Sequence, residues 1–71
     1  MQWTYVRDGR RRACTLRRVE PGFPLLEISY ECADSPIVVP FDDDDLRVCA
    51  QVALERDWVA AGWSLETFAA D

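Results

Sequence analysis

Four consecutive aspartates, Asp42, Asp43, Asp44 and Asp45, form the densest group of chemically active side chains in the sequence. Hard divalent cations prefer carboxylate oxygens, so weak cation binding is one interpretation. A calcium-binding loop, however, spaces its acids alternately around a central glycine, and this run does not. We therefore expect no metal site and no cofactor. Two interpretations stay open: a solvated helix start, or an acidic surface that fits a basic groove on another protein.

Arginines gather near the opposite end of the chain. The first 19 residues hold six of the eight basic residues, with Asp8 as their only acid, whereas twelve of the 13 acids come later. Guanidinium groups bind phosphates, and Trp3 and Tyr5 are close enough in sequence to suggest base stacking, so a nucleic-acid-binding module is an alternative function. The net charge of −5 argues against it, because domains that bind nucleic acid are usually basic. The candidate contact residues at this end are Arg7, Arg10, Arg11 and Arg12.

The residue types argue against catalysis. The chain has no histidine, and Ser29, Ser35 and Ser64 have no neighbouring base in the motifs of nucleophilic enzymes. Paired carboxylates can act as acid and base, but a 71-residue domain offers little room for a concave pocket that excludes water. We expect that the protein is not an enzyme.

The three cysteines, Cys14, Cys32 and Cys49, are odd in number and spaced by 18 and 17 residues. This spacing matches neither a paired disulfide framework nor the close ligand pairs of a zinc site. Reduced, buried thiols are the prediction.

Length and hydropathy predict one small domain over residues 1–71. With 49% hydrophobic residues the chain is too apolar to stay disordered, although 30% of it is charged. It starts without the basic and apolar segments of a signal peptide, and its longest uncharged apolar stretch, residues 37–41, is far shorter than the roughly 20 residues that cross a bilayer. We expect a cytoplasmic protein with no membrane partner. Its use of arginine without lysine indicates a GC-rich bacterial or phage coding sequence.

Turn residues predict an antiparallel β-meander over residues 2–39. The pair Asp8-Gly9 predicts a two-residue hairpin that sets Arg7 opposite Arg10, Tyr5 opposite Arg12 and Trp3 opposite Cys14. A three-residue loop over residues 20–22 then sets Val19 opposite Phe23, Leu16 opposite Leu26 and Cys14 opposite Ile28, which places the apolar residues of all three strands on one face. A fourth strand, residues 37–39, lies between two prolines and suits a sheet edge.

The opposite face of the meander is mostly polar. Its register sets Arg11 opposite Glu31 and Arg17 diagonal to Glu27. Cross-strand ion pairs of this kind stabilise a sheet slightly and need no ligand.

One helix is predicted over residues 42–61, with Asp42 as its N-cap and Gly62 as its end. At 100° per residue, a broad apolar stripe is expected to pack on the sheet, and it consists of Leu46, Cys49, Ala50, Ala53, Leu54, Ala60 and Ala61. Val48, Val52 and Val59 cluster on nearly the opposite side. The C-terminal tail, residues 63–71, is a strand or a short turn. Either this tail folds over the valines, or they form an exposed strip that docks a partner.

These features predict an α+β domain, a three- or four-stranded antiparallel meander with one helix packed on one face. The sorted charges favour a non-catalytic regulatory protein that binds a host or cellular protein with a basic surface, as a phage or mobile-element inhibitor or modulator binds a host enzyme such as RNA polymerase. The expected contact residues are Asp42, Asp43, Asp44, Asp45, Val48, Val52 and Val59, with the arginines as a second contact. The oligomeric state is open.

Overall fold

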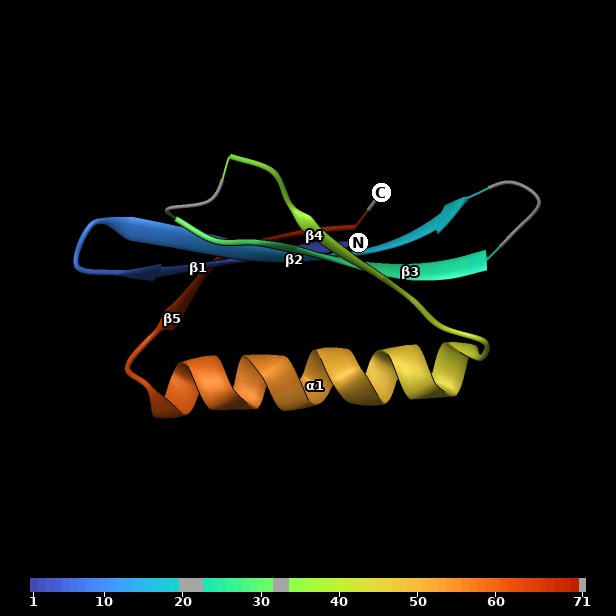
Figure 1. Cartoon of the computed structure of the whole chain (residues 1–71). Helices are drawn as coiled ribbons and strands as arrows, with labels where there is room; N and C mark the ends of the chain where they lie inside the picture. The colour runs from blue at the N-terminus through green and yellow to red at the C-terminus, as the bar shows by residue number, and fades with distance from the viewer. Residues whose placement is uncertain (20–22, 32–33, 71) are drawn as a thin grey trace.

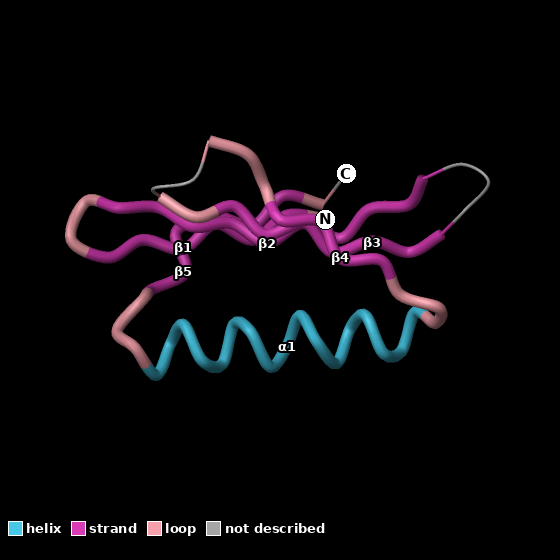
Figure 2. The backbone as a smooth tube through the Cα atoms, in the orientation of Figure 1, coloured by secondary structure: helices cyan, strands magenta, loops and turns pink. Residues whose placement is uncertain are grey.

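The computed structural model describes residues 1–19, 23–31 and 34–70, in which one antiparallel sheet forms one layer and one helix the other (Figures 1 and 2). The elements are β1 (Gln2–Arg7), β2 (Arg10–Val19), β3 (Phe23–Ser29), β4 (Ile37–Pro40), α1 (Asp44–Ala60) and β5 (Ser64–Ala69). The strand order across the sheet is β4-β3-β2-β1-β5. The α+β class is confirmed.

The sheet has five strands, so the predicted three- or four-stranded meander is wrong in its strand number. The additional strand, β5, comes from the segment that was predicted as a tail. The chain turns after α1 at Gly62, whose φ of +95° suits glycine, and β5 then pairs with the otherwise free edge of β1. This pairing gives the backbone groups on that edge their hydrogen-bond partners.

The first hairpin forms as predicted. Asp8 and Gly9 have φ values of 50° and 77°, which is the pair of left-handed residues that a tight hairpin turn requires. Arg7 pairs with Arg10, Tyr5 with Arg12 and Trp3 with Cys14.

The β2–β3 register is also confirmed. Val19 pairs with Phe23, so three residues connect the strands, and Leu16 pairs with Leu26. The predicted loop itself, residues 20–22, lies outside the described residues. Because side chains alternate along a strand, this register gathers Tyr5, Cys14, Leu16 and Leu26 on one face, where they are buried and form the core with Trp58 and Trp63.

β4 is an edge strand, as predicted, and it pairs only with β3. Pro40 lies opposite Leu25 at its end. Proline lacks a backbone N–H donor, so an edge position tolerates it.

Helix α1 begins one residue later than a helix capped by Asp42. Asp43 is the N-cap: its backbone is extended, and its side chain accepts a hydrogen bond from the Asp45 amide at 2.6 Å. The last helical residue is Ala60, and Ala61 is the C-cap. The described residues contain no helix that is long and apolar enough to cross a membrane.

The face that α1 turns toward the sheet differs from the prediction. The buried helix residues are Arg47, Gln51, Glu55 and Trp58. In the stripe expected to be buried, only Ala50 and Leu54 border the core, and the other members, Leu46, Cys49, Ala53, Ala60 and Ala61, are exposed.

Trp58 explains this rotation of the helix. Its ring is 3% exposed and makes edge-to-face contacts with Tyr5 at 5.5 Å and with Tyr30 at 6.1 Å between ring centroids. A buried indole removes far more apolar surface from water than a row of alanines does, so the aromatic contact decides which face is buried. Glu55 and Gln51 precede Trp58 by three and seven residues, which places them on the same helix face.

Candidate binding surfaces

The valine strip, Val48, Val52 and Val59, lies on the outside of the molecule. These side chains are 42%, 42% and 57% exposed. Leu46, on another side of the helix, is 58% exposed. The interpretation in which the C-terminal tail covers the valines is wrong, because that segment forms β5 and pairs with β1. At 100° per residue the three valines lie within about 40° of each other, roughly a quarter-turn from the buried helix face.

Acidic side chains border one end of the valine strip. Asp42, Asp43 and Asp45 are exposed at the start of α1. Asp44 is about half exposed and forms an ion pair with Arg47 at 2.9 Å. The structure therefore places the aspartates at the start of α1 and the valines along about three turns that follow.

The buried side of α1 is polar, and specific partners hold its charges. The Tyr5 hydroxyl donates a hydrogen bond to Glu55 Oε1 at 2.6 Å, and Arg47 Nη1 donates to the Arg17 carbonyl oxygen at 2.8 Å. Burial and the hydrogen bond to Glu55 raise the pKa of the Tyr5 hydroxyl well above its usual value of 10.0, so the donor stays protonated. Arg47 Nε has no hydrogen-bond partner in the described part of the chain.

Breaking such a buried arrangement is costly, because a buried charge without its partner loses hydration and gains nothing in exchange. The helix thus keeps polar groups inside and valines outside. Full burial of one valine side chain stabilises a protein by about 1.5–3 kcal/mol. Because these three valines stay about half exposed, their apolar surface can still be buried by a partner. An exposed apolar row of this kind is typical of a protein-binding surface.

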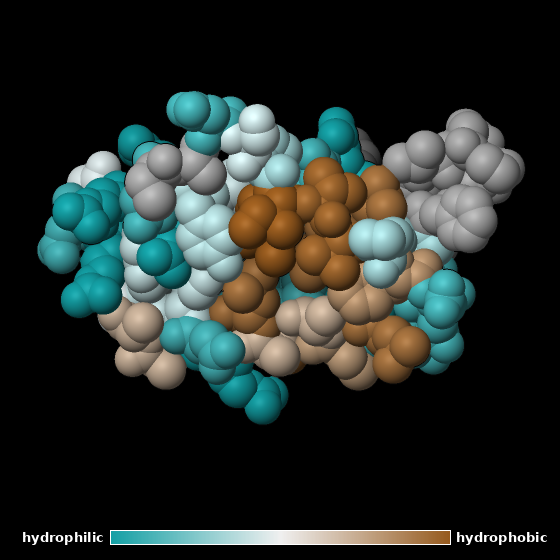
Figure 3. All heavy atoms as spheres, in the orientation of Figure 1, coloured by the Kyte–Doolittle hydropathy of each residue, from teal (hydrophilic) through white to brown (hydrophobic). Residues whose placement is uncertain are grey.

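A further apolar region lies on the face shown in Figure 3, where apolar atoms gather over β4 and the adjoining part of α1. Ile37 on β4 is 50% exposed. Sequence reasoning treated this segment only as an edge strand. The signal that was available is its composition, since β4 carries three successive β-branched apolar residues.

Strand alternation separates the four arginines of the first hairpin into two groups. Arg11 points to the sheet face away from α1 and makes two hydrogen bonds with Glu66 on β5, at 2.9 and 3.2 Å. The predicted Arg11–Glu31 pair is therefore wrong. The reason is that β3 ends at Ser29, so Glu31 is free to reach Arg12, while the unexpected strand β5 brings Glu66 beside Arg11. The Arg17–Glu27 pair is confirmed at 2.6 Å.

Arg12 is held from several directions. Its guanidinium donates two hydrogen bonds to Glu31, at 2.8 and 3.1 Å, and its Cζ lies 4.2 Å from the ring centroid of Trp63 and 5.0 Å from that of Tyr30. The hydrogen bonds from Arg12 lower the pKa of Glu31 from 4.5 to about 2. Arg12 therefore fixes the end of the hairpin to Trp63, directly before β5, and to Glu31, just beyond β3.

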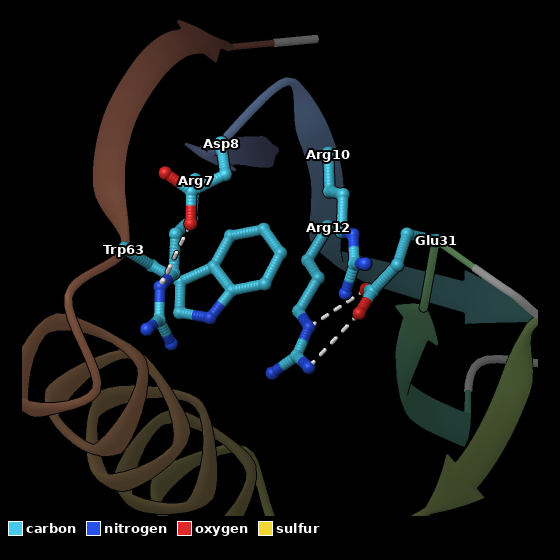
Figure 4. A pocket seen from close by; sticks show the side chains of 6 residues that line it. All are labelled: Arg7, Asp8, Arg10, Arg12, Glu31 and Trp63. Carbon is cyan, nitrogen blue, oxygen red and sulfur yellow. Dashed lines mark hydrogen bonds and ion pairs between the residues drawn. The ribbon is translucent and has the colours of Figure 1, made fainter.

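Beside Arg12 lies a cavity of about 300 Å³ at the same end of the molecule (Figure 4). Its lining residues are Arg7, Asp8, Arg10, Arg12, Glu31 and Trp63. We call it the hairpin pocket. Sequence reasoning identified its arginines but missed Trp63 and Glu31, because neither belongs to the hairpin.

The cysteines lie apart in the fold. Cys14 is fully buried, and burial raises the pKa of its thiol to about 12. Cys49 is exposed, so the prediction of a buried thiol is wrong there, because α1 is rotated relative to the expected orientation. Cys32 lies outside the described residues. Both described thiols are free.

Comparison of the chain with protein-family models, curated protein sequences and solved structures finds no match.

Proposed function

We propose that this protein is a non-catalytic regulatory protein that binds another protein through the side of α1 that carries the valine strip. The observation that carries the proposal is the reversed amphipathicity of the helix, which buries Arg47, Gln51 and Glu55 and leaves its valines in solvent. A surface helix normally turns its apolar stripe toward its own core. Here a second apolar surface on a partner would complete the burial.

Charge complementarity identifies the chemistry of the partner. The valine strip is bordered by the exposed aspartates of the first helical turn, and the chain carries a net charge of −5. The fitting partner is a protein with an apolar groove that is flanked by basic residues. A helix of 17 residues is about 25 Å long, which is long enough to fill such a groove. A bacterial host enzyme, RNA polymerase among the candidates, remains our proposal for the class of partner.

The nucleic-acid alternative has less support. Two of its four predicted contact residues, Arg11 and Arg12, each make two hydrogen bonds with a glutamate. A phosphate backbone would have to displace those carboxylates before it gained the guanidinium contacts. The alternative stays a prediction for the remaining two arginines only.

The test starts with capture of a partner from a lysate of a GC-rich bacterium, followed by purification of that partner and calorimetric titration. Val52→Glu should weaken the affinity by about tenfold or more, since it places a charge in the centre of an apolar contact. Asp43→Asn combined with Asp45→Asn should slow association and reduce its dependence on salt, and asparagine retains the capping role of Asp43.

The matched control is Val38→Glu. Val38 is 49% exposed, but it pairs with Glu27 on the sheet face away from α1. The same substitution at this position should leave the affinity within about twofold, because exposed positions outside the contact contribute little. Equal weakening by Val38→Glu and Val52→Glu would show that α1 does not form the contact.

A further inference from the structure

Two arginines that line the hairpin pocket, Arg7 and Arg10, have no described carboxylate within hydrogen-bond distance. Arg11, Arg12, Arg17 and Arg47 each have a carboxylate oxygen within 2.6 to 2.9 Å. Arg7 Nε lies 3.7 Å from Asp8 Oδ2, which is too long for a hydrogen bond, and Asp8 is largely exposed. Arg10 forms no ion pair with any residue that the structure describes, although its charge contributes to the lowered pKa of Glu31.

The backbone forces these two arginines together. They are direct cross-strand partners at the end of the β1–β2 hairpin, and both line the same cavity. Like charges directly opposite each other destabilise a strand pair. Figure 4 shows Arg7 on one side of the Trp63 indole and Arg10 on the other, next to Arg12. An anion bound in this pocket would offset the repulsion between the two cations.

The other lining groups set the net charge of the pocket. Glu31 is ionised over the physiological pH range and is matched by Arg12, which holds it with two hydrogen bonds. Asp8 opposes one of the two remaining cations. The pocket therefore keeps an excess positive charge that no described carboxylate neutralises by a hydrogen bond.

The shape of the pocket selects among anions. The Trp63 side chain is buried, and the Arg12 guanidinium covers its ring face at 4.2 Å, so no open aromatic surface remains on which a nucleobase could stack. A volume of about 300 Å³ corresponds to the smaller pockets that bind small molecules. The planar fork of an arginine side chain matches the oxygens of a phosphoryl group.

From this arrangement we propose that the hairpin pocket is a binding site for the phosphoryl group of a small phosphorylated molecule, with Arg7 and Arg10 as the groups that contact it. Arg12 and Trp63 act as the rigid wall of the site. The proposal is independent of partner binding by α1, because the two surfaces share no residue.

The experiment is an NMR titration of the full chain with inorganic phosphate, using sodium chloride at matched ionic strength as the reference. The Nε–Hε resonances of Arg7 and Arg10 should shift saturably with phosphate and not with chloride. Arg10→Gln should weaken the apparent affinity by about tenfold, the loss expected for hydrogen bonds to a charged group. Arg7→Gln provides a second variant, should Arg10→Gln disturb the hairpin.

Arg11→Gln is the matched control, since Arg11 neighbours Arg10 in sequence but lies on the other sheet face and is paired with Glu66. It should change the affinity by less than about twofold. A titration without saturable shifts at Arg7 and Arg10 overturns the proposal. So does an equal loss in Arg11→Gln together with tight, salt-sensitive binding of a single-stranded oligonucleotide, which would identify a nucleic-acid surface instead.

Discussion

The sheet buries alternate apolar residues from its strands, whereas the helix that covers it buries Arg47, Gln51 and Glu55 and leaves its valines in solvent. Both layers contribute to one core, yet different forces orient them. In the sheet, the register of each hairpin moves every apolar side chain to the same face at once. In the helix, one large aromatic contact, that of Trp58 with Tyr5 and Tyr30, fixes the rotation and carries polar neighbours inside.

The apolar content of an element therefore does not determine which face it buries. Tyr5 and Glu55 illustrate this, since their 2.6 Å hydrogen bond lets a carboxylate lie against the sheet. The valine strip is thereby left on the outside, where a partner can use it.

The largest expected effect on stability comes from the removal of the Trp58 side chain. Trp58→Ala should lower the free energy of unfolding by about 3–5 kcal/mol, because it removes a buried indole and its two aromatic contacts. Urea denaturation measures this, and Trp58→Phe, which retains a ring, gives a smaller loss where the alanine variant does not fold. Val59→Ala, at the next and exposed position, should stay within about 0.5 kcal/mol. Similar losses at both positions would mean that α1 is rotated differently.

A smaller effect concerns the hairpin end of the sheet and its dependence on pH. Arg12 lowers the pKa of Glu31 in the folded protein from 4.5 to about 2, so the ion pair stabilises the fold fully above pH 4.5 and is lost as the pH falls toward 2. Glu31→Gln should therefore be less stable than the natural sequence at neutral pH, and the difference should disappear near pH 2. Urea denaturation over this pH range tests it. A difference that stays constant would show that the charge of Glu31 does not contribute.

Local rules predicted the sheet pair by pair for the first three strands. The two-residue turn places Trp3 opposite Cys14, and a three-residue connection with alternating apolar residues places Leu16 opposite Leu26. Nothing beyond nearest neighbours in the chain is needed to determine such a register.

The sequence left residues 63–71 open as a strand or a short turn because the apolar residues of β5 do not alternate. Leu65 and Phe68 are three residues apart, but a bulge lets them pair with Tyr5 and Trp3, which lie on one face of β1. A period of two is therefore absent from the sequence of β5. The same missing period explains the wrong partner for Arg11, since Glu66 belongs to β5.

The helix face could not be predicted from periodicity because apolar residues occur all around α1. Leu46, Val48 and Trp58 point in three different directions around the helix and are all apolar. The deciding contacts, from Trp58 and Glu55 to Tyr5, join residues about 50 positions apart. Val48, Val52 and Val59 share one exposed side of α1, and their role as contact residues stays a prediction. The ion-pair partners of the arginines depend on the fold, as Arg11 and Arg12 show.

The reactivity of the Cys49 thiol tests the orientation of α1 most directly. The test uses a variant that carries Cys14→Ser and Cys32→Ser, so that Cys49 is its one thiol. We predict that Cys49 reacts with a thiol reagent under native conditions at a rate within about tenfold of that in the unfolded chain, because its side chain is exposed on α1. If Cys49 were instead protected and reacted only as the whole domain unfolds, the stripe that contains Leu46 and Cys49 would face the sheet, and Arg47, Gln51 and Glu55 would not be the residues that α1 buries.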